Sequence, residues 1–319
     1  TGVLERDQQG TADTYTYNYW SSPVGIINEG TSNYSYKLSQ ILKDGIQDIN
    51  FITSGYNGAI GPPIGIADYW IWKFANQLDN DYASWQHVRS TSDIYAGEGF
   101  TMKGPGTGNV IDNQNYVFNG KPNNGNITLS INTGNDYLVG NPYSSAIDAN
   151  KFILDNSDTT GALYYWEHFG GGTHNTIEYQ GGYAVYNLSG GIPAIQYDYS
   201  TGGSDPSGGT GLKTPGRYIP VAQGFFVIGN ANGTINFNNS QRIFKKENES
   251  SVFVRSSNRA ATRSFNDEAD NRLKIRLSFE SSDTLKRQLL ITRDSQATNQ
   301  IDFGYDAVNT LLRVSGTDT

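Results

Sequence analysis

Three histidines are the only imidazole groups in this chain of 319 residues, and they limit the chemistry it can perform. A catalytic serine needs a histidine base and an orienting acid, usually at an exposed Gly-x-Ser-x-Gly elbow. That motif does not occur, and the absence of cysteine excludes thiol catalysis. His87, His168 and His174 are therefore interpreted as polar residues on strands or loops. Glu167, His168 and His174 could instead form a metal cluster, but their spacing is neither helical nor typical of zinc sites.

Glycoside hydrolysis would need two carboxylates a short distance apart. Glu98, Glu167 and Glu178 are candidates because glutamate is scarce before residue 245, but no motif pairs them. The glycine-rich stretch 200–216 lacks the Gly-Lys-Ser/Thr ending of a phosphate-binding loop and is interpreted as a surface loop. The sequence therefore predicts that this protein is not an enzyme.

Calcium is the ion that the sequence favours most. The stretch "DSQATNQIDFGYD" supplies Asp294, Asn299, Asp302 and Asp306, and hard oxygen ligands on loops suit Ca²⁺. The pattern is not that of an EF-hand. Asp and Asn in such loops also cap their own backbone turns, so this structural role remains the alternative.

Aromatic residues form two dense clusters that could bind a ligand. The first contains Trp70, Trp72 and Trp85 with Tyr69 and Tyr82, and the second contains Tyr164, Tyr165 and Trp166. Tyrosine and tryptophan are favoured at recognition surfaces, and their flat faces can stack on the C–H faces of sugars. The alternative is that these rings fill the core of a β-rich fold with few leucines.

Composition indicates a folded, turn-rich β-protein. Aromatic residues make up 13% of the chain and charged residues only 17%, which argues against disorder. The net charge of −8 and the lack of a Lys/Arg cluster exclude nucleic acid as the expected partner. No apolar run reaches the ~18 residues of a membrane-spanning helix. No signal peptide opens the chain, and it begins with Thr1, so we expect a processed chain or a fragment.

The fold class that we predict is all-β with a few short helices. Alternating apolar residues, as at Ile127, Leu129 and Ile131, predict strands. Helices are predicted within 36–49 and 144–155, the second with Ser145 as its N-cap.

Residues 1–245 contain an apparent duplication, with units at 15–122 and 137–245. Three pairs of motifs follow one another in the same order: "YNYWSSPVG" with "YLVGNPYSS", "GEGFTMKG" with "AQGFFVIG", and "YVFNGKPN" with "INFNNSQR". The stretches 69–74 and 164–169 match more weakly, as do 81–87 and 181–187. Lys103 stands opposite Ile228, so we expect one copy to expose a position that the other covers.

Composition changes near residue 245. Residues 245–319 hold 12 of the 23 Lys and Arg but only 2 of the 37 Gly. Residues 246–271 are predicted to be a linker or long connection. In 272–319, Leu273, Ile275, Leu277 and Phe279 alternate with polar residues, which predicts a strand with one buried face. A second strand is predicted at 287–294. We interpret this tail as the start of a jelly-roll-like β-sandwich module.

The combination of motifs resembles a region of large secreted proteins of the Bacteroidota, which lies shortly before the sorting domain of their type IX secretion system. The segments that carry the resemblance are "YTYNYWSSPVG", "GEGFTMKG", "VFNGKPNNG", "GNPYSSAIDANKFI", "YYWEHF", "IPVAQGFFV", "RLKIRLSFE" and "QLLITRDSQATNQIDFGYDA". The sorting domain itself is absent from this sequence. Asp158-Thr159-Thr160 and Asp283-Thr284-Leu285 resemble the sites at which these bacteria attach O-glycans.

The resemblance implies secretion across the outer membrane and a place outside the cell or on its surface. Many members are described as adhesins. We therefore expect a non-enzymatic module for adhesion or display, whose partners are surface glycans or other surface and secretion proteins. A carbohydrate-binding module that uses the aromatic clusters is the alternative, and an enzyme is the third reading.

Overall fold

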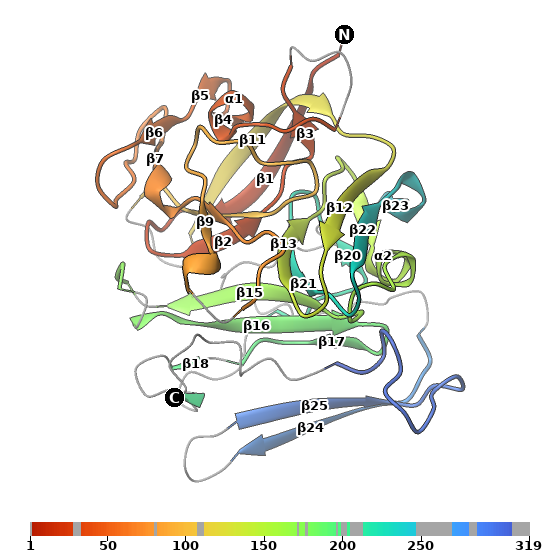
Figure 1. The fold of residues 1–319 in the computed structure, drawn as a ribbon. Helices are drawn as coiled ribbons and strands as arrows, with labels where there is room; N and C mark the ends of the chain where they lie inside the picture. Colours follow the sequence, from red (N-terminus) through yellow and green to blue (C-terminus); the bar gives the residue numbers. More distant parts are fainter. Residues whose placement is uncertain are drawn as a thin grey trace.

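Short β-strands form the framework of this chain (Figure 1). The structure, a computed structural model, describes residues 2–27, 33–79, 82–106, 112–170, 172–175, 178–195, 197–198, 203–204, 213–246, 270–280 and 286–307. Within these residues α1 (Leu38–Ile41) and α2 (Ala149–Asp155) are the only α-helices, so the predicted all-β class with a few short helices is confirmed. Neither of these two helices has the length and apolar character needed to cross a membrane.

Both helices are shorter than predicted. The region after α1 forms a hairpin of β4 (Leu42–Asp44) and β5 (Gln47–Asp48), in which Gly45 adopts a φ of 59°. The loop residues are Gly45 and Ile46, and glycine at the first loop position favours such a tight turn, so this local preference outweighs the helical spacing of the apolar residues. In the second case Asp148, not Ser145, is the N-cap of α2, because its Oδ1 accepts the Asn150 N–H at 3.1 Å.

Residues 4–122, termed the first half, are built mainly from antiparallel pairs, with one parallel pair described below. β2 (Tyr17–Trp20) pairs with β10 (Phe100–Lys103). The long strand β11 (Asn113–Pro122) pairs with β1 (Leu4–Thr11), with β3 (Val24–Gly25) and with β4.

Residues 127–243, termed the second half, repeat this scheme. β13 (Asp136–Gly140) pairs with β21 (Gly224–Ile228), and β12 (Ile127–Ile131) pairs with β22 (Gly233–Phe237). β14 (Ala146–Asp148) pairs with β20 (Tyr218–Ile219) and with β23 (Arg242–Ile243). The pairs β2–β10 and β13–β21 contain the matching sequence motifs, and a helix follows β3 and β14 alike. The strand pairing thus recurs in the two halves, and β1 and β12, which take part in it, lie before residues 15 and 137.

The two halves also bond to each other at equivalent positions. Ser21 N–H donates to the Ala222 carbonyl at 2.9 Å, and Gly140 N–H donates to the Gly97 carbonyl at 3.0 Å. Gly97 and Ala222 both precede a Gly-Phe strand by two residues, and both have a positive φ, 88° and 61°. The contact is therefore reciprocal, and each half completes the edge of the other.

The halves differ in the segment between their helix and their Gly-Phe strand. In the second half β15 (Leu163–Gly170), β16 (Gln180–Asn187), β17 (Gly190–Ile192), β18 (Tyr197–Asp198) and β19 (Gly203–Ser204) widen the β13–β21 sheet. In the first half β6 (Asn50–Ile52) pairs with β7 (Gly65–Ala67), and β8 (Trp72–Lys73) pairs with β9 (Gln86–His87). The 3₁₀ turns η1 (Asp68–Trp70) and η2 (Tyr82–Ser84) connect these short strands. The weakly matching stretches therefore differ in local structure.

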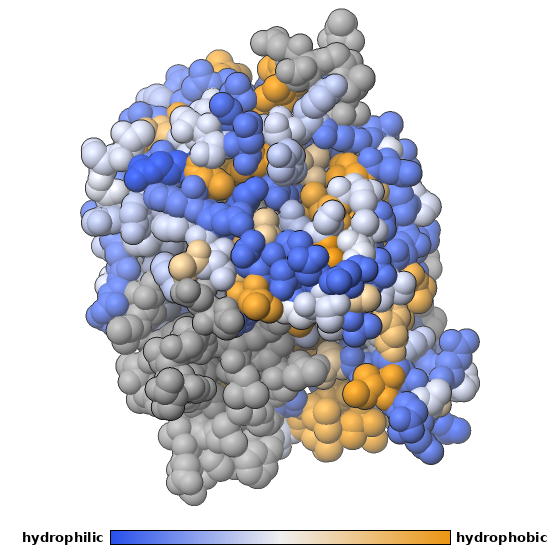
Figure 2. All heavy atoms as spheres, in the orientation of Figure 1, coloured by the Kyte–Doolittle hydropathy of each residue, from blue (hydrophilic) through white to orange (hydrophobic). Residues whose placement is uncertain are grey.

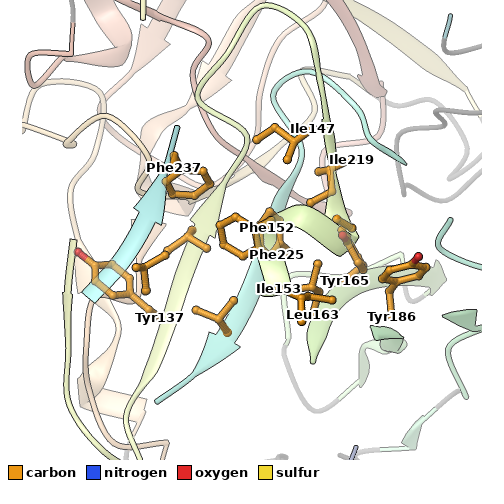
Figure 3. Close-up of a cluster of buried hydrophobic side chains, with 14 of the residues drawn as sticks. Tyr137, Ile147, Phe152, Ile153, Leu163, Tyr165, Tyr186, Ile219, Phe225 and Phe237 are labelled. Carbon is orange, nitrogen blue, oxygen red and sulfur yellow. The ribbon is translucent and has the colours of Figure 1, made fainter. Parts of the chain in front are cut away.

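The widened sheet is buried on both faces. On one face Phe152 of α2, Tyr165, Phe225 and Phe237 form the core of the second half (Figure 3). On the other face Trp166 and its neighbours Tyr164 and Phe226 pack against Tyr19 and Phe74 of the first half. Alternate side chains of β15 thus face two different cores.

The tail forms a hairpin of β24 (Lys274–Glu280) and β25 (Lys286–Thr292), which lies beside β17 (Figure 1). Arg276 donates to the Gly191 carbonyl at 2.9 Å, and Leu188 N–H donates to the Gly304 carbonyl at 2.6 Å. Phe303 and Tyr305 pack against the core of the second half, so the tail is anchored to it. Most of the predicted linker, residues 247–269, lies outside the described residues.

The apolar face of the tail hairpin differs from the prediction. Leu273, Ile275 and Leu277, predicted to be buried, are exposed in this chain, as are Leu289 and Ile291 on the partner strand (Figure 2). A two-stranded hairpin can be covered on one of its faces and exposed on the other. Here the face that carries Arg276 bonds to β17, and the face that carries Leu277 and Leu289 is exposed.

Candidate functional site

Five ring side chains of the first half gather at the surface and are termed the aromatic patch. Its members come from the segments between β6 and β9, and they are Tyr56, Tyr69, Trp72, Tyr82 and His87. Tyr56 and Tyr82 are 54% and 63% exposed, His87 is exposed, and Tyr69 and Trp72 are half-buried. The patch therefore offers ring faces and edges to solvent.

Strand pairing and ring contacts fix the centre of the patch. Trp72 and His87 are cross-strand partners in β8 and β9, and their rings stack with centroids 4.0 Å apart at 13°. Tyr69 meets His87 edge-on at 5.2 Å, and Tyr56 meets Tyr69 edge-on at 4.9 Å. Burial and then the neighbouring Tyr69 raise the pKa of Tyr82. Offset and edge-on geometries of this kind are those that aromatic rings prefer.

η1 directs its two aromatic residues to different layers. Tyr69 joins the patch, whereas Trp70 is buried beneath it and donates from its indole N–H to the Tyr56 carbonyl at 2.7 Å. The turn is held from below, because the buried Asp68 carboxylate accepts hydrogen bonds from Arg89 at 3.0 Å and Ser90 at 3.1 Å.

Lys103 lies in this lower layer and is only 2% exposed. Its amino group is 3.6 Å from the centre of the Trp70 ring, 4.5 Å from that of Tyr17 and 4.9 Å from that of Tyr179. It also donates to the Tyr179 hydroxyl. The two copies differ in exposure at this position, as expected, and Lys103 is the buried residue while Ile228 is half-buried.

His174 links Lys103 to the surface. Its Nδ1 is 3.3 Å from the Lys103 amino group, and its Nε2 is 2.6 Å from Oδ1 of the exposed Asn57. An ammonium group only donates, so Nδ1 accepts and Nε2 carries the hydrogen that Asn57 accepts. The imidazole also stacks on Trp70, with centroids 4.8 Å apart at 19°.

Burial sets the protonation of these groups. It lowers the pKa of Lys103 to about 7, against a smaller opposing effect of Asp13. Burial and then the charge of Lys103 lower the pKa of His174 to about 4. Burial also lowers the pKa of His168 to about 3, so both imidazoles are neutral at physiological pH.

The second predicted aromatic cluster does not reach the surface. Tyr164, Tyr165 and Trp166 are buried on the two faces of β15, between the cores described above. Trp70 is buried as well, while Trp85 is half-buried and packs edge-on against Phe74. Of the eight aromatic residues in the two predicted clusters, Tyr69, Trp72 and Tyr82 belong to the aromatic patch.

The predicted calcium ligands make other contacts. Asp294 pairs with Arg272 at 2.9 Å, Asp302 accepts the Thr298 N–H at 2.6 Å, and Asp306 accepts the Asp302 N–H at 2.8 Å. They thus cap turns, which was the alternative reading. Within the described residues no group of three or more His, Asp or Glu side chains is placed to hold a metal ion, so we do not propose calcium.

The three glutamates considered as candidate carboxylates are likewise engaged. Glu98 is ion-paired with Lys73 at 2.9 Å and accepts the Tyr137 hydroxyl at 2.9 Å. Glu167 is buried within β15, and Glu178 accepts an amide hydrogen from Asn175 at 3.0 Å.

The two O-glycan-like motifs have different outcomes. Thr159 is buried, and its hydroxyl donates to the Asn156 carbonyl at 2.8 Å, so the fold leaves no room for a glycan there. Asp283-Thr284-Leu285 lies outside the described residues.

Sequence reasoning did not find Tyr56, Asn57, His174 or Tyr179 as members of one site. They lie in two distant segments, with 117 positions between Asn57 and His174, and no spacing connects them. The one available signal was Lys103, a cation at a position where the other half has an apolar residue.

Comparison with known proteins gives one match. Searches of the curated proteins and of the solved structures each found none. The model of a family described as a domain of unknown function (DUF8693) matches residues 56–313, which includes the aromatic patch, the second half and the tail hairpin. The family unit thus runs across the compositional boundary near residue 245. Since the match covers well over half of the sequence, the chain belongs to this DUF8693 family.

Proposed function

We propose that this chain is a non-enzymatic adhesion module of a secreted or surface-displayed protein, and that its aromatic patch binds carbohydrate. The observation that carries the proposal is the stacked Trp72–His87 pair, flanked by Tyr69 and by the exposed Tyr56 and Tyr82. It combines the adhesion role implied by the family resemblance with the ligand class that suits the patch.

Preorganisation supports a binding role for the patch. Trp72 and His87 are held by strand pairing, and Tyr56 is tied by its carbonyl to the Trp70 indole. A sugar that docks on rings already fixed in place does not incur the entropic cost of ordering them. Tyrosine and tryptophan also provide a large contact area with few rotatable bonds.

The non-enzymatic part of the proposal is supported by the state of the carboxylates. Glu98 is committed to Lys73, and Glu167 is enclosed in the interior. Neither is placed as one of a pair of carboxylates flanking a bound sugar, which glycoside hydrolysis requires.

The extracellular location is supported by the resemblance to type IX-secreted proteins. We propose export across the outer membrane, followed by release or display at the cell surface.

A glycan array tests the proposal. The wild-type chain should bind a subset of glycans, and Trp72→Ala and Tyr69→Ala should each weaken that binding at least tenfold. Tyr34→Ala is the matched control, because Tyr34 is exposed but makes no ring contact with the patch. Wild-type protein that binds no glycan, or a Trp72→Ala variant that binds as well as wild type, would refute a carbohydrate function for the patch.

A further inference from the structure

We propose that the ligand is an acidic glycan, whose sugar ring takes the place of the His174 imidazole on Trp70 and whose carboxylate pairs with Lys103. This inference rests on the proposed carbohydrate function and names the class of sugar that the site would select.

His174 occupies a position that suits a ligand ring. The Lys103 amino group and the His174 ring lie 3.6 Å and 4.8 Å from the centre of Trp70, and 3.3 Å separates the amino group from Nδ1. If the amino group and the imidazole lay on opposite faces of the indole, the distance between them would approach the sum of their two distances from Trp70. Because the amino group is only 3.3 Å from Nδ1, both groups lie on the same face of Trp70. The imidazole thus covers a stacking surface, accepts from Lys103 and donates to Asn57.

The three residues that contact His174, namely Trp70, Asn57 and Lys103, could make the contacts that an acidic sugar needs. Trp70 supplies the flat face for the C–H side of the ring, Asn57 supplies a side-chain amide for a hydroxyl, and Lys103 supplies a cation. His174 is half-buried, and the neighbouring Gly172 and Asn175 are exposed, so its side chain can leave toward solvent without disturbing a core.

Among the described residues, Lys103 lacks the counter-ion that the buried Glu98, Asp68 and Asp148 have. Glu98, Asp68 and Asp148 are each paired with a Lys or Arg at 2.8–3.0 Å. Among the described residues Lys103 makes no ion pair, and its partners are a phenol, an imidazole and three ring faces.

A carboxylate is the group that best completes this environment. Buried cations are stable in proteins when they are paired with an anion and hydrogen-bonded. An acidic sugar would bring that anion into a site of low dielectric, where the attraction is stronger than in water. A neutral sugar would stack on the same rings but would leave the ammonium uncompensated.

The other ionisable groups around the site do not replace this anion. Asp13, the acid that acts on Lys103, already accepts the Tyr15 N–H at 2.9 Å and the Thr16 hydroxyl. Tyr15, Tyr17, Tyr56 and Tyr179 contribute phenol rings, and the nearby His168 is a neutral imidazole that bonds to the Gly170 carbonyl.

Calorimetric titration with oligogalacturonate and with its neutral methyl ester, at about pH 6 where Lys103 is charged, tests the inference. Wild type should bind the acid about tenfold more tightly than the ester. His174→Ala should bind the acid more tightly still, whereas His174→Phe, which keeps a flat ring on Trp70, should not. Lys103→Met should lose the preference for the acid, and Lys151→Met, an exposed lysine on α2, should keep it.

The outcomes separate this inference from the proposed function. Equal affinity for acid and ester in both wild type and His174→Ala overturns the acidic class, while binding of the ester would still support a carbohydrate site. A preference for the acid that persists in Lys103→Met also overturns the inference. Failure of wild type and His174→Ala to bind either probe or any arrayed glycan overturns both proposals. The His174 variants keep the test decisive if Lys103→Met does not fold.

Discussion

The amino group of Lys103 lies 3.6 Å from the centre of the Trp70 indole, within a layer of neutral partners. The ring faces, rather than a carboxylate, offset part of the cost of burying this cation, although burial still lowers its pKa to about 7. This arrangement also explains why a position that packs as an apolar residue in the other half can accommodate a lysine here. The stem of Lys103 fills the apolar slot, and the rings receive its charged end.

Removing the lysine should change how stability depends on pH. The folded pKa of Lys103 is about 7, below the unfolded value of 10.5, so between these values the unfolded chain binds more protons. The free energy of unfolding of wild type should therefore rise from pH 7 toward pH 10 through this group. Lys103→Met should lack that rise, and urea unfolding at several pH values measures the difference.

The histidines also make the free energy of unfolding rise with pH, but in a lower pH range. His168 and His174 have folded pKa values of about 3 and 4 against 6.5 when unfolded, so their contribution to stability is lost as pH falls below about 6.5. Lys103→Met should still lose most of this stability as the pH falls, because the two histidines remain. A Lys103→Met profile parallel to that of wild type above pH 7 would contradict the lowered pKa.

The Lys73–Glu98 pair should be critical to the first half. Glu98 is 2% exposed, and Lys73 is its only cationic partner among the described residues. Lys73→Met would leave a buried carboxylate unpaired, which should cost about 3–5 kcal/mol in the free energy of unfolding. Urea denaturation with Lys151→Met as the control measures this loss.

The second half indicates how the loss could be repaired. Gln223 is buried at the position equivalent to Glu98. Lys73→Met combined with Glu98→Gln should therefore recover much of the stability that Lys73→Met loses. A single variant as stable as wild type would show that the pair contributes little.

Two tryptophans from the predicted ligand-binding set should respond differently to truncation. Trp166 is enclosed by Tyr19, Tyr183 and the other rings that pack between the widened sheet and the first half. Trp166→Ala should therefore cost about 3–5 kcal/mol in the free energy of unfolding. Trp72 is half-buried, and Trp72→Ala should cost about 1–2 kcal/mol. Urea unfolding ranks the two, and equal losses would contradict the assignment of one to the core and the other to the surface.

The sequence predicted the features that depend on neighbouring residues. Alternation and turn residues gave the β-class, and the motifs around Gly99 and Gly224 lie in strands with equivalent partners. It failed where tertiary contacts decide. β15 reads as an aromatic-rich strand, but only the fold shows that both of its faces are covered, which removes Tyr164 and Tyr165 from any binding surface.

The site itself was beyond local patterns. Lys103 meets His174 across 71 positions, and His174 meets Asn57 across 117. None of the three lies in a motif with a required spacing, so no periodicity could bring them together. The hairpin at Gly45 shows the opposite case, because a local signal, glycine at the first position of a two-residue loop, is present in the sequence and outweighs the helical spacing.

The glycines of the two matching strands should be intolerant of a side chain for the same reason in each half. A Cβ on Gly224 would lie 2.8 Å from the Trp20 backbone nitrogen, and one on Gly99 would lie 2.9 Å from the Val139 carbonyl oxygen. Each glycine thus faces the strand of the other half, at the reciprocal contact that joins them. Backbone atoms cannot move aside as a flexible side chain can, so Gly224→Ala and Gly99→Ala should each cost about 1–3 kcal/mol. Gly172→Ala is the control, because no atom lies within 4 Å of a Cβ there. Thermal unfolding compares the three, and if either strand variant melts together with Gly172→Ala, the close approach of the two halves is not as tight as this geometry requires.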